Sequence, residues 1–254
     1  MLYFLSDLLP KNVSIDGRYI EPFVGGGSMF LHVRPKEAII SDLNKDLIDL
    51  YRGIKNYPHK VWRIFADFPS GKEAYYSVRD TDYLDEHLSY RAARTLYLNR
   101  TCFKGMWRHN PRGEFNVGYG GDERRWAITY GNIVGLSNIF KQATIEQSDF
   151  GPILDKTCDG DFIFLDPPYK PGSKEMFEAH YINGKFSFED QRRLSIKLRA
   201  ITETRKIKWM MTNSSHPEIC KLYKNFNIRK IPKGVSDTIG VQTQESNEVV
   251  ISNY

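Results

Sequence analysis

The chain contains the stretch Phe162-Ile163-Phe164-Leu165-Asp166-Pro167-Pro168-Tyr169, in which four apolar residues lead directly into an Asp-Pro-Pro-Tyr turn. The apolar run predicts a buried strand of a parallel sheet, and the prolines end it because they lack a backbone N–H. Open α/β sheets bind ligands at the carboxyl ends of such strands. A carboxylate, turn carbonyls and an aromatic ring at that edge favour a planar substrate with an amino group. A plain turn whose tyrosine fills the core is the alternative.

A glycine-rich turn lies near the start of the chain. Residues 18–23 predict a strand that runs into Val24-Gly25-Gly26-Gly27-Ser28 and then a helix start. Glycines allow a backbone to approach a ligand closely at a helix N-terminus. The next predicted strand ends at Asp42, about 20 residues on, where a carboxylate can accept hydrogen bonds from a ribose. This order predicts a nucleoside-bearing cofactor, although Asp42 or Asn44 could simply cap the helix predicted over Lys45–Tyr57.

Five segments, taken in order, resemble the Dam-type DNA adenine-N6 methyltransferases, a class I family that uses S-adenosylmethionine. The resemblance covers the chain from about Tyr19 to Tyr254, and its Asp-Pro-Pro-Tyr motif is the most specific part. The segments are Phe23–Gly27, Arg91–Arg100, Arg108–Val117, Asp166–Tyr169 and Glu248–Tyr254.

The resemblance implies S-adenosylmethionine as cofactor and double-stranded DNA as substrate. Adenine N6 is a poor nucleophile, and hydrogen bonds from its two hydrogens to Asp166 and to the carbonyl of Pro167 would free its lone pair to attack a methyl sulfonium. The base must leave the duplex to be reached, and Tyr169 would stack on it. Positioning would carry most of the catalysis, with Asp166, Pro167, Pro168 and Tyr169 as the catalytic turn.

The predicted cofactor contacts follow from the same resemblance. Asp42 would hold the ribose, while Asp149 and Phe150 would flank the cofactor's adenine. A loop acid and a core ring are the alternative roles of that pair. The full predicted set is Phe23, Gly25, Gly26, Gly27, Asp42, Asp149, Phe150 and Asp166.

Positive charge is uneven along the chain, whose formal net charge is +5. Between Arg91 and Arg125 eight Lys/Arg face three acidic residues, and aromatic residues are interleaved, as suits a segment that holds phosphates and probes bases. Glycine and proline break regular structure near Lys104–Arg112, so we expect a DNA-recognition loop there. We expect Arg108 to read guanine, and Arg124 and Arg125 to meet phosphates. The predicted DNA contacts are Arg100, Lys104, Met106, Arg108, Asn110, Arg112, Arg124 and Arg125.

Composition narrows the possible compartments of the protein and the kinds of site that it can contain. The three cysteines are odd in number and far apart, which favours reduced thiols in a cytosol. The start of the chain does not read as a secretory signal, and no apolar run reaches membrane-spanning length. The histidines form neither a His-Glu-x-x-His pair nor a Cys/His cluster, so no metal site is expected. We therefore predict a cytoplasmic protein, bacterial or phage-encoded, that acts on DNA, with a cognate restriction endonuclease as a functional partner.

Alternating strands and helices predict an α/β fold with a doubly wound sheet. The resemblance implies a Rossmann-like, mostly parallel, seven-stranded sheet whose last strand is antiparallel. Residues 58–141 lack a convincing buried strand and predict helices near Val61–Phe65, Lys72–Val78 and Leu88–Arg100. We therefore predict an inserted helical target-recognition domain at 58–141 and a catalytic, cofactor-binding domain made of 1–57 and 142–254.

Departures from the family pattern leave alternatives open. The family's Gly-rich, Lys-bearing segment before the first helix is not seen ahead of Leu2, which keeps a catalytically impaired DNA-binding homologue as an alternative. Lys104 and Gly118 replace a familiar Asn and Pro, so GATC is a candidate target only. Cytosine-N4 methylation remains a rival because both exocyclic amines suit the same turn. A nicotinamide-dependent oxidoreductase would explain the glycine turn but not Asp166–Tyr169.

Overall fold

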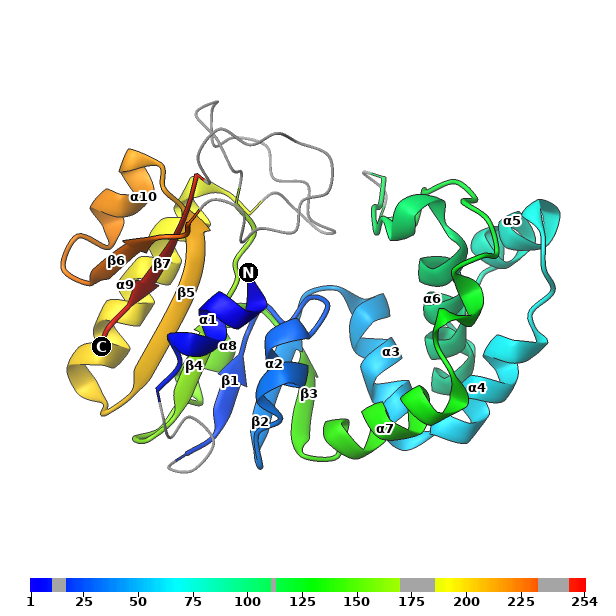
Figure 1. Ribbon diagram of the computed structural model, residues 1–254, viewed down its shortest axis with the longest axis horizontal. Coiled ribbons are helices and arrows are strands. Elements are labelled where there is room, and N and C mark those ends of the chain that lie inside the picture. The colour runs from blue at the N-terminus through cyan, green and yellow to red at the C-terminus, as the bar shows by residue number, and fades with distance from the viewer. Residues whose placement is uncertain (11–16, 111–112, 170–185, 233–246) are drawn as a thin grey trace. The chain divides into compact units, whose positions relative to one another are not determined.

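The computed structural model describes residues 1–10, 17–110, 113–169, 186–232 and 247–254, and all structural statements refer to these residues. The chain contains a seven-stranded sheet of order β3-β2-β1-β4-β5-β7-β6 (Figure 1). The strands are β1 Tyr19–Glu21, β2 Ala38–Asp42, β3 Ala143–Gln147, β4 Phe162–Leu165, β5 Lys208–Ser214, β6 Asn227–Lys230 and β7 Glu248–Ser252.

The strand directions confirm the predicted fold class. Strand β1 pairs in parallel with β2 and β4, and β4 pairs in parallel with β5. The last strand, β7, runs antiparallel to both neighbours, β5 and β6. The chain order reverses between β1 and β4, because β2 and β3 follow on one side and β5 on the other. Such a reversal leaves a crevice at the carboxyl ends of the two strands, which is the usual ligand position in this class of sheet.

The chain divides into two compact units, which we describe separately. Unit 1 comprises Met1–Ser41 and Ser148–Tyr254, and unit 2 comprises Asp42–Gln147. The helices of unit 1 are α1 Leu2–Asp7, α2 Ser28–Val33, α8 Phe150–Asp155, α9 Phe188–Thr204 and α10 Pro217–Leu222. Those of unit 2 are α3 Lys45–Asn56, α4 Pro58–Asp67, α5 Lys72–Asp80, α6 Leu88–Thr101, η1 Phe103–Gly105, η2 Arg125–Ala127 and α7 Tyr130–Phe140.

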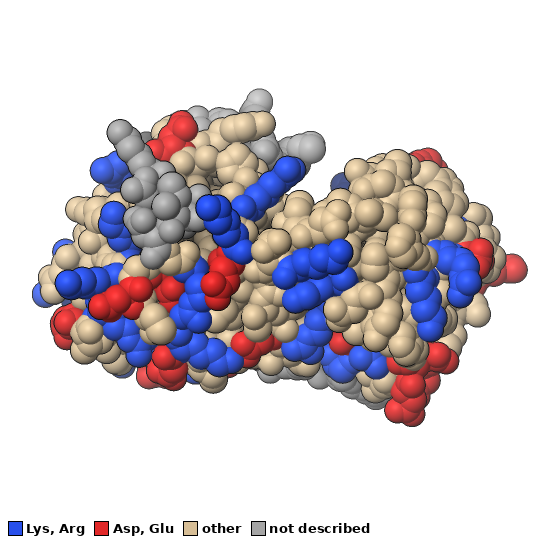
Figure 2. All heavy atoms as spheres, turned by 90° about the horizontal axis from the view of Figure 1, so that it is seen from below, with Lys and Arg blue, Asp and Glu red and all other residues tan. Residues whose placement is uncertain are grey.

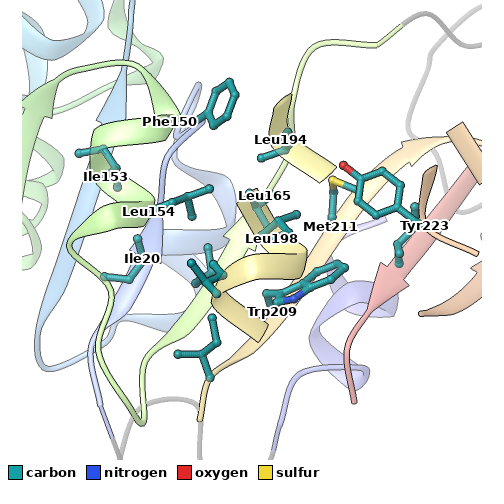
Figure 3. Close-up of a cluster of buried hydrophobic side chains, with 14 of the residues drawn as sticks. Ile20, Phe150, Ile153, Leu154, Leu165, Leu194, Leu198, Trp209, Met211 and Tyr223 are labelled. Carbon is teal, nitrogen blue, oxygen red and sulfur yellow. The ribbon is translucent and has the colours of Figure 1, made fainter. Parts of the chain in front are cut away.

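Unit 1 encloses a cluster of buried hydrophobic side chains. Ile20 and Leu165 of the sheet meet Leu194 and Leu198 of α9, and the indole of Trp209 closes the layer (Figure 3). These side chains are 0% exposed, so their burial removes several hundred Å² of apolar surface from water and holds α8 and α9 on this face. The opposite face is covered as well, because Tyr19 points away from Ile20 and its ring lies 6.3 Å from that of Phe30 in α2.

Helix α3 packs within unit 2 through a close backbone approach. A Cβ atom on Gly53 would lie 2.3 Å from Cβ of Ala92 in α6, so only glycine lets the two helices come this near. The unit boundaries therefore fall at Ser41/Asp42 and Gln147/Ser148. The predicted boundaries 57/58 and 141/142 delimit the target-recognition domain, and the extent of that domain stays a prediction.

Helix prediction was right for α4, α5 and α6 but missed α7. A capping box formed by Thr129 and Asn132 starts α7, and Gly131 and Gly135 within it weaken its helical signal in the sequence. Among the described residues, no helix combines the length and apolarity needed to cross a bilayer. Likewise, the described part of the chain holds no trio of His, Cys, Asp or Glu side chains placed to bind a metal ion.

Candidate active site

A cavity of about 610 Å³ in unit 1 lies at the carboxyl ends of β1 and β4. The glycine turn forms one wall and the Asp166–Tyr169 turn another. The described lining also includes Met1, Leu2, Leu5, Glu21, Phe164 and Glu248. Two motifs far apart in the sequence thus meet at the point where strand order reverses, as the sequence predicts.

The glycine turn is open toward the cavity. Its backbone is held by hydrogen bonds from Val24 N to the carbonyl of Ser41 (2.9 Å) and from Gly27 N to that of Val24 (2.7 Å). Gly25 and Gly27 have φ angles of 45° and 70°, which favour glycine. A Cβ atom on Gly25 would meet no atom within 4 Å, and one on Gly26 only Ser28 Oγ at 4.0 Å. The glycines therefore leave space beside the backbone, as a bound group would require.

Phe23 connects the cavity to an aromatic cluster. Its ring centroid lies 5.4 Å from that of Phe150 and 5.6 Å from that of Phe186. Phe150 is 2% exposed and belongs to the core, and the guanidinium carbon of Arg193 lies 4.1 Å from its ring centroid. Asp149 caps α8 through Gly151 N and pairs with both terminal nitrogens of Arg193 at 2.8 and 2.9 Å. These contacts agree with the alternative roles, in which Asp149 is a loop acid and Phe150 is a core ring. A cofactor role for Asp149 and Phe150 stays a prediction.

The carboxylate of Asp149 has a lowered pKa. Burial opposes its ionisation, but hydrogen bonds from Arg193 and from the N–H of Gly151 outweigh that cost. It is therefore ionised at neutral pH and engaged in holding α8 against α9.

Asp42 ends β2 and is 2% exposed. Its Oδ1 accepts a hydrogen bond from Asn44 N at 2.9 Å, and the Asn44 side chain accepts from Leu47 N and caps α3. Both helix-starting interactions are therefore present. The ribose contact of Asp42 stays a prediction, since Asp42 is not part of the described cavity lining.

Asp166 is an exposed residue of the cavity lining. Loss of water around it raises its pKa, the hydroxyl of Thr212 lowers it by donating a hydrogen bond to Oδ1, and the nearby carboxylate of Glu248 raises it again. Thr212 lies on β5 and is 1% exposed. Thr212 thus holds one carboxylate oxygen, and the other has no hydrogen-bond partner among the described residues.

Helix α9 supports the turn through a short relay. Gln191 donates from Nε2 to the carbonyl of Pro168 at 3.3 Å, and its Oε1 accepts from Asn213 Nδ2 at 3.0 Å. No described residue donates to the carbonyl of Pro167. The relay therefore occupies one turn carbonyl and leaves the other available.

Glu21 is a cavity residue that the sequence analysis missed. It ends β1, is 2% exposed and accepts a hydrogen bond from the hydroxyl of Tyr19 at 2.7 Å. Burial raises its pKa to about 8, the Tyr19 hydrogen bond opposes this, and the charge of Asp166 adds to it. Its place directly before the glycine turn was a usable signal, because a carboxylate ending a buried strand is costly without a partner.

Unit 2 carries the predicted recognition segment as a hairpin whose described parts are residues 102–110 and 113–119, hereafter the recognition hairpin. Isolated bridges join Cys102 to Tyr119 and His109 to Phe115 in antiparallel fashion. His109 Nε2 lies 3.4 Å from Asp46 Oδ2 of α3, which anchors the hairpin within unit 2. The predicted loop therefore has defined backbone pairing on both sides of its tip.

Several predicted DNA contacts are exposed on this hairpin. Arg108 donates from Nε to Asn116 Oδ1 at 2.9 Å, and its terminal nitrogens donate to no described residue. Lys104 is exposed with φ 52°, and Met106 is 42% exposed. Asn110 forms the hairpin tip, where its side chain bonds Glu114. Arg112 lies outside the described residues.

The predicted phosphate contact of Arg125 is wrong, because Arg125 is 1% exposed. Its guanidinium donates to the carbonyls of Phe65, Ala66 and Phe68 and stacks among aromatic rings. Arg125 therefore holds unit 2 together.

Arg124 and Arg100 reach the surface but also have structural bonds. Arg124 donates to the carbonyls of Asn99 and Cys102 at 3.3 and 3.0 Å, and Arg100 donates to the carbonyl of Arg124 at 3.0 Å. These bonds fix the base of the recognition hairpin. DNA contacts by Arg100 and Arg124 stay predictions.

Charged side chains of both signs are mixed on part of the surface. On the side seen in Figure 2, Lys and Arg side chains lie beside Asp and Glu side chains in several places, and neighbouring charges of opposite sign cancel at a distance.

Comparison with known proteins identifies the family. The family model described as "D12 class N6 adenine-specific DNA methyltransferase" matches residues 1–235. The chain is 31% identical to the Type II methyltransferase M1.LlaDCHI of Lactococcus lactis subsp. cremoris over 265 residues, covering 100% of this chain and 91% of that protein. It is 33% identical to M.MjaIII of Methanocaldococcus jannaschii, covering 98% and 93%.

A third relative is the DNA N-6-adenine-methyltransferase of Escherichia phage P1. It is 35% identical and aligns with 85% of this chain but only 29% of its own length. With the family match spanning most of the chain and the cavity formed by two of its motifs, the resemblance seen in the sequence is confirmed. The chain belongs to the D12 class N6 adenine-specific DNA methyltransferases.

Proposed function

We propose that this protein transfers the methyl group of S-adenosylmethionine to N6 of an adenine flipped out of double-stranded DNA. The observation that carries the proposal is the unit 1 cavity, where the glycine turn and the Asp-Pro-Pro-Tyr turn converge. A DNA methyltransferase needs both a methyl donor and a base within reach of each other, and this cavity brings their predicted binding elements together.

The cavity's charge supports a cationic methyl donor. Among the described residues, its lining includes the carboxyl groups of Asp166 and Glu248, the carboxyl group of Glu21, which is mostly protonated at neutral pH, and no Lys, Arg or His side chain. A sulfonium carries positive charge on the group to be transferred, so such a lining favours it electrostatically. The open space beside Gly25 and Gly26 suits the donor's methionine part, Phe23 its apolar surface and Asp42 its ribose.

The protein's own groups would prepare the amine. Bound S-adenosylmethionine supplies an activated methyl group with a neutral thioether as leaving group. The free oxygen of Asp166 and the carbonyl of Pro167 accept hydrogen bonds from the two N6 hydrogens, which favours a tetrahedral nitrogen whose lone pair points away from the ring. Tyr169 stacks on the base, and Pro168, held by Gln191, keeps the turn rigid.

We further propose that the recognition hairpin reads the target site in the major groove, with Arg108 on guanine and Met106 as an apolar wedge. GATC is a candidate sequence. The names of the two Type II relatives support a role beside a restriction endonuclease, although modification and cleavage need no physical contact.

The test replaces Asp166 with alanine and measures transfer from tritiated S-adenosylmethionine to DNA, with nucleoside mass spectrometry of the product. We expect N6-methyladenine from the wild type and a loss of at least about a hundredfold in Asp166→Ala, with donor binding by calorimetry largely unchanged. Asp7→Ala, an exposed carboxylate of α1, is the control and should behave as wild type. Substantial activity in Asp166→Ala contradicts the mechanism. N4-methylcytosine as product would favour the cytosine rival, and binding of nicotinamide nucleotides instead would favour the oxidoreductase.

A further inference from the structure

The hydroxyl of Tyr169 is anchored by a residue that lies far away in the sequence. It donates to Glu248 Oε1 at 3.1 Å. Tyr169 ends the turn after β4, whereas Glu248 begins β7, and β5 lies between these strands in the sheet. The contact therefore crosses over the end of a whole strand at the cavity rim.

Strand register explains how the two residues meet. Leu165 of β4 pairs with Met211 of β5, so Asp166 is level with Thr212, which donates to its carboxylate. Ser214, two residues further along β5, pairs with Glu248. The turn and the start of β7 consequently reach the same height above the sheet, and the far end of the Tyr169 ring arrives at the Glu248 carboxylate.

The Tyr169 hydroxyl needs only one acceptor oxygen, whereas the Glu248 carboxylate has two oxygens and a negative charge. A neutral amide oxygen would accept the hydroxyl equally well, yet Glu248 Oε2 is buried and finds no donor among the described residues. Glu248 also lies close enough to Asp166 to disfavour ionisation of that carboxyl. Such a placement costs folding free energy, and costly charged groups are typical of functional sites.

We infer that Glu248 is a positioning residue that holds the Tyr169 ring in the orientation in which the target base stacks on it. This inference rests on the proposed function, because it assigns Tyr169 to the flipped-out adenine. Without the anchor, the tyrosine side chain would be free to rotate about its first torsion, and the base would lose its preformed platform.

A double-mutant cycle tests the inference. Tyr169→Phe keeps the ring but removes the donor, and Glu248→Ala removes the acceptor. If Glu248 acts through the hydroxyl, each change should lower kcat by a similar factor, about tenfold to a hundredfold, and the double variant should be no worse than either alone. Glu248→Gln should restore most of kcat, since its amide oxygen still accepts the hydroxyl. Glu248→Ala and Glu248→Gln both remove a cavity carboxylate and should change KM for the donor alike, whereas Tyr169→Phe should leave it unchanged.

A spectroscopic measurement separates positioning from simple loss of stability. 2-Aminopurine at the target position fluoresces according to how it is stacked, so Glu248→Ala and Tyr169→Phe should shift its intensity in the protein–DNA complex alike, and Glu248→Gln should not. Two matched controls remove the same groups elsewhere in unit 1. Tyr254→Phe deletes a hydroxyl bonded to the carbonyl of Leu8, and Glu203→Ala deletes an exposed carboxylate of α9.

The outcomes are distinguishable. Additive effects of the two single changes, or unchanged 2-aminopurine fluorescence in Glu248→Ala, overturn the inference while leaving the proposed function in place. A wild-type protein without adenine methylation overturns the proposed function itself. Failure of Glu248→Gln to recover kcat, with fluorescence restored, would show that the charge and not the anchor is needed, and would also overturn the inference.

Discussion

Three carboxyl groups share the cavity with no basic side chain in its described lining, and Glu21 is the most deeply buried of them. Its pKa lies near 8 in the folded protein, against an ordinary value of 4.5. The folded state therefore holds this proton more tightly than the unfolded state does between these two values. The contribution to stability is full below about pH 4.5 and is lost as the pH rises toward 8.

We predict that the free energy of unfolding of the wild type falls between pH 5 and pH 8 relative to that of Glu21→Gln, because only the wild type has a carboxyl group that ionises in the unfolded state while it stays protonated in the folded state. Saturating S-adenosylmethionine should reduce this fall, since its positive charge favours the ionised form. Urea denaturation at a series of pH values measures both effects. Parallel pH profiles for the two proteins would show that Glu21 does not titrate in this range.

Gly26 offers a way to separate folding from donor binding. Its φ is not in the left-handed region, and an added Cβ would enter open space. We therefore expect Gly26→Ala to fold with nearly wild-type stability but to bind S-adenosylmethionine more weakly, because the methyl group occupies space reserved for the ligand. Thermal unfolding with and without the donor tests this. Gly135→Ala, an open helical position in α7, is the control, and an undiminished donor-induced shift in Gly26→Ala would contradict the cavity assignment.

At the scale of the element, hydrogen bonds within the recognition hairpin hold the Arg108 side chain, although glycine and proline in this segment break regular structure. The bond from Arg108 Nε to Asn116 orients the guanidinium and leaves its two terminal nitrogens directed away from that bond. Backbone pairing between Arg108 and Asn116, with Asn116 N to Arg108 O at 3.1 Å, reinforces this orientation. A fork held in this way suits the two acceptors on the major-groove edge of guanine.

We predict that Arg108→Ala costs about 1–3 kcal/mol of binding to the preferred site and relaxes the preference at one base pair. Asn116→Ala should weaken the same preference by less, because the guanidinium remains but loses its orientation. Binding to the site and to its single-base variants, at several salt concentrations, distinguishes base from phosphate contacts. Equal weakening on all sequences would identify Arg108 as a phosphate contact. Lys141→Ala, at the end of α7, serves as the charge control.

At the scale of the whole molecule, the cavity and its catalytic turn lie in unit 1, whereas the recognition hairpin lies in unit 2. Chemistry and target recognition therefore depend on separate sets of packing interactions.

This separation predicts where the methyl donor alone should change amide hydrogen exchange. S-adenosylmethionine without DNA should slow exchange in residues 19–31 and 162–169 and next to Asp42, while the recognition hairpin should exchange as before. Peptide-resolved exchange measured by mass spectrometry is the appropriate experiment. Protection confined to the hairpin would place the donor outside the cavity of unit 1.

Much of this protein was predictable from its sequence, because the decisive signals are local. The apolar run before Asp166 and the two prolines predicted a buried strand with a turn at its end. Strand β4, all of whose residues are buried, confirms this prediction. The capping box of Ser187 and Asp190, which starts α9, is likewise a local feature. The order of the glycine turn, the Arg91–Val117 region and the Asp-Pro-Pro-Tyr turn along the chain was enough to predict the family, and the resemblance implied the mostly parallel sheet.

Only the tertiary structure decided which polar residues face the cavity and which arginines are buried. Arg124 and Arg125 are neighbours in sequence, yet one is exposed and the other is surrounded by carbonyls contributed by residues 65–68. Thr212 and Glu248 became recognisable as site residues only when strand register brought them to one edge. Such contacts join residues far apart in the chain, and no local propensity or periodicity encodes which of them will meet.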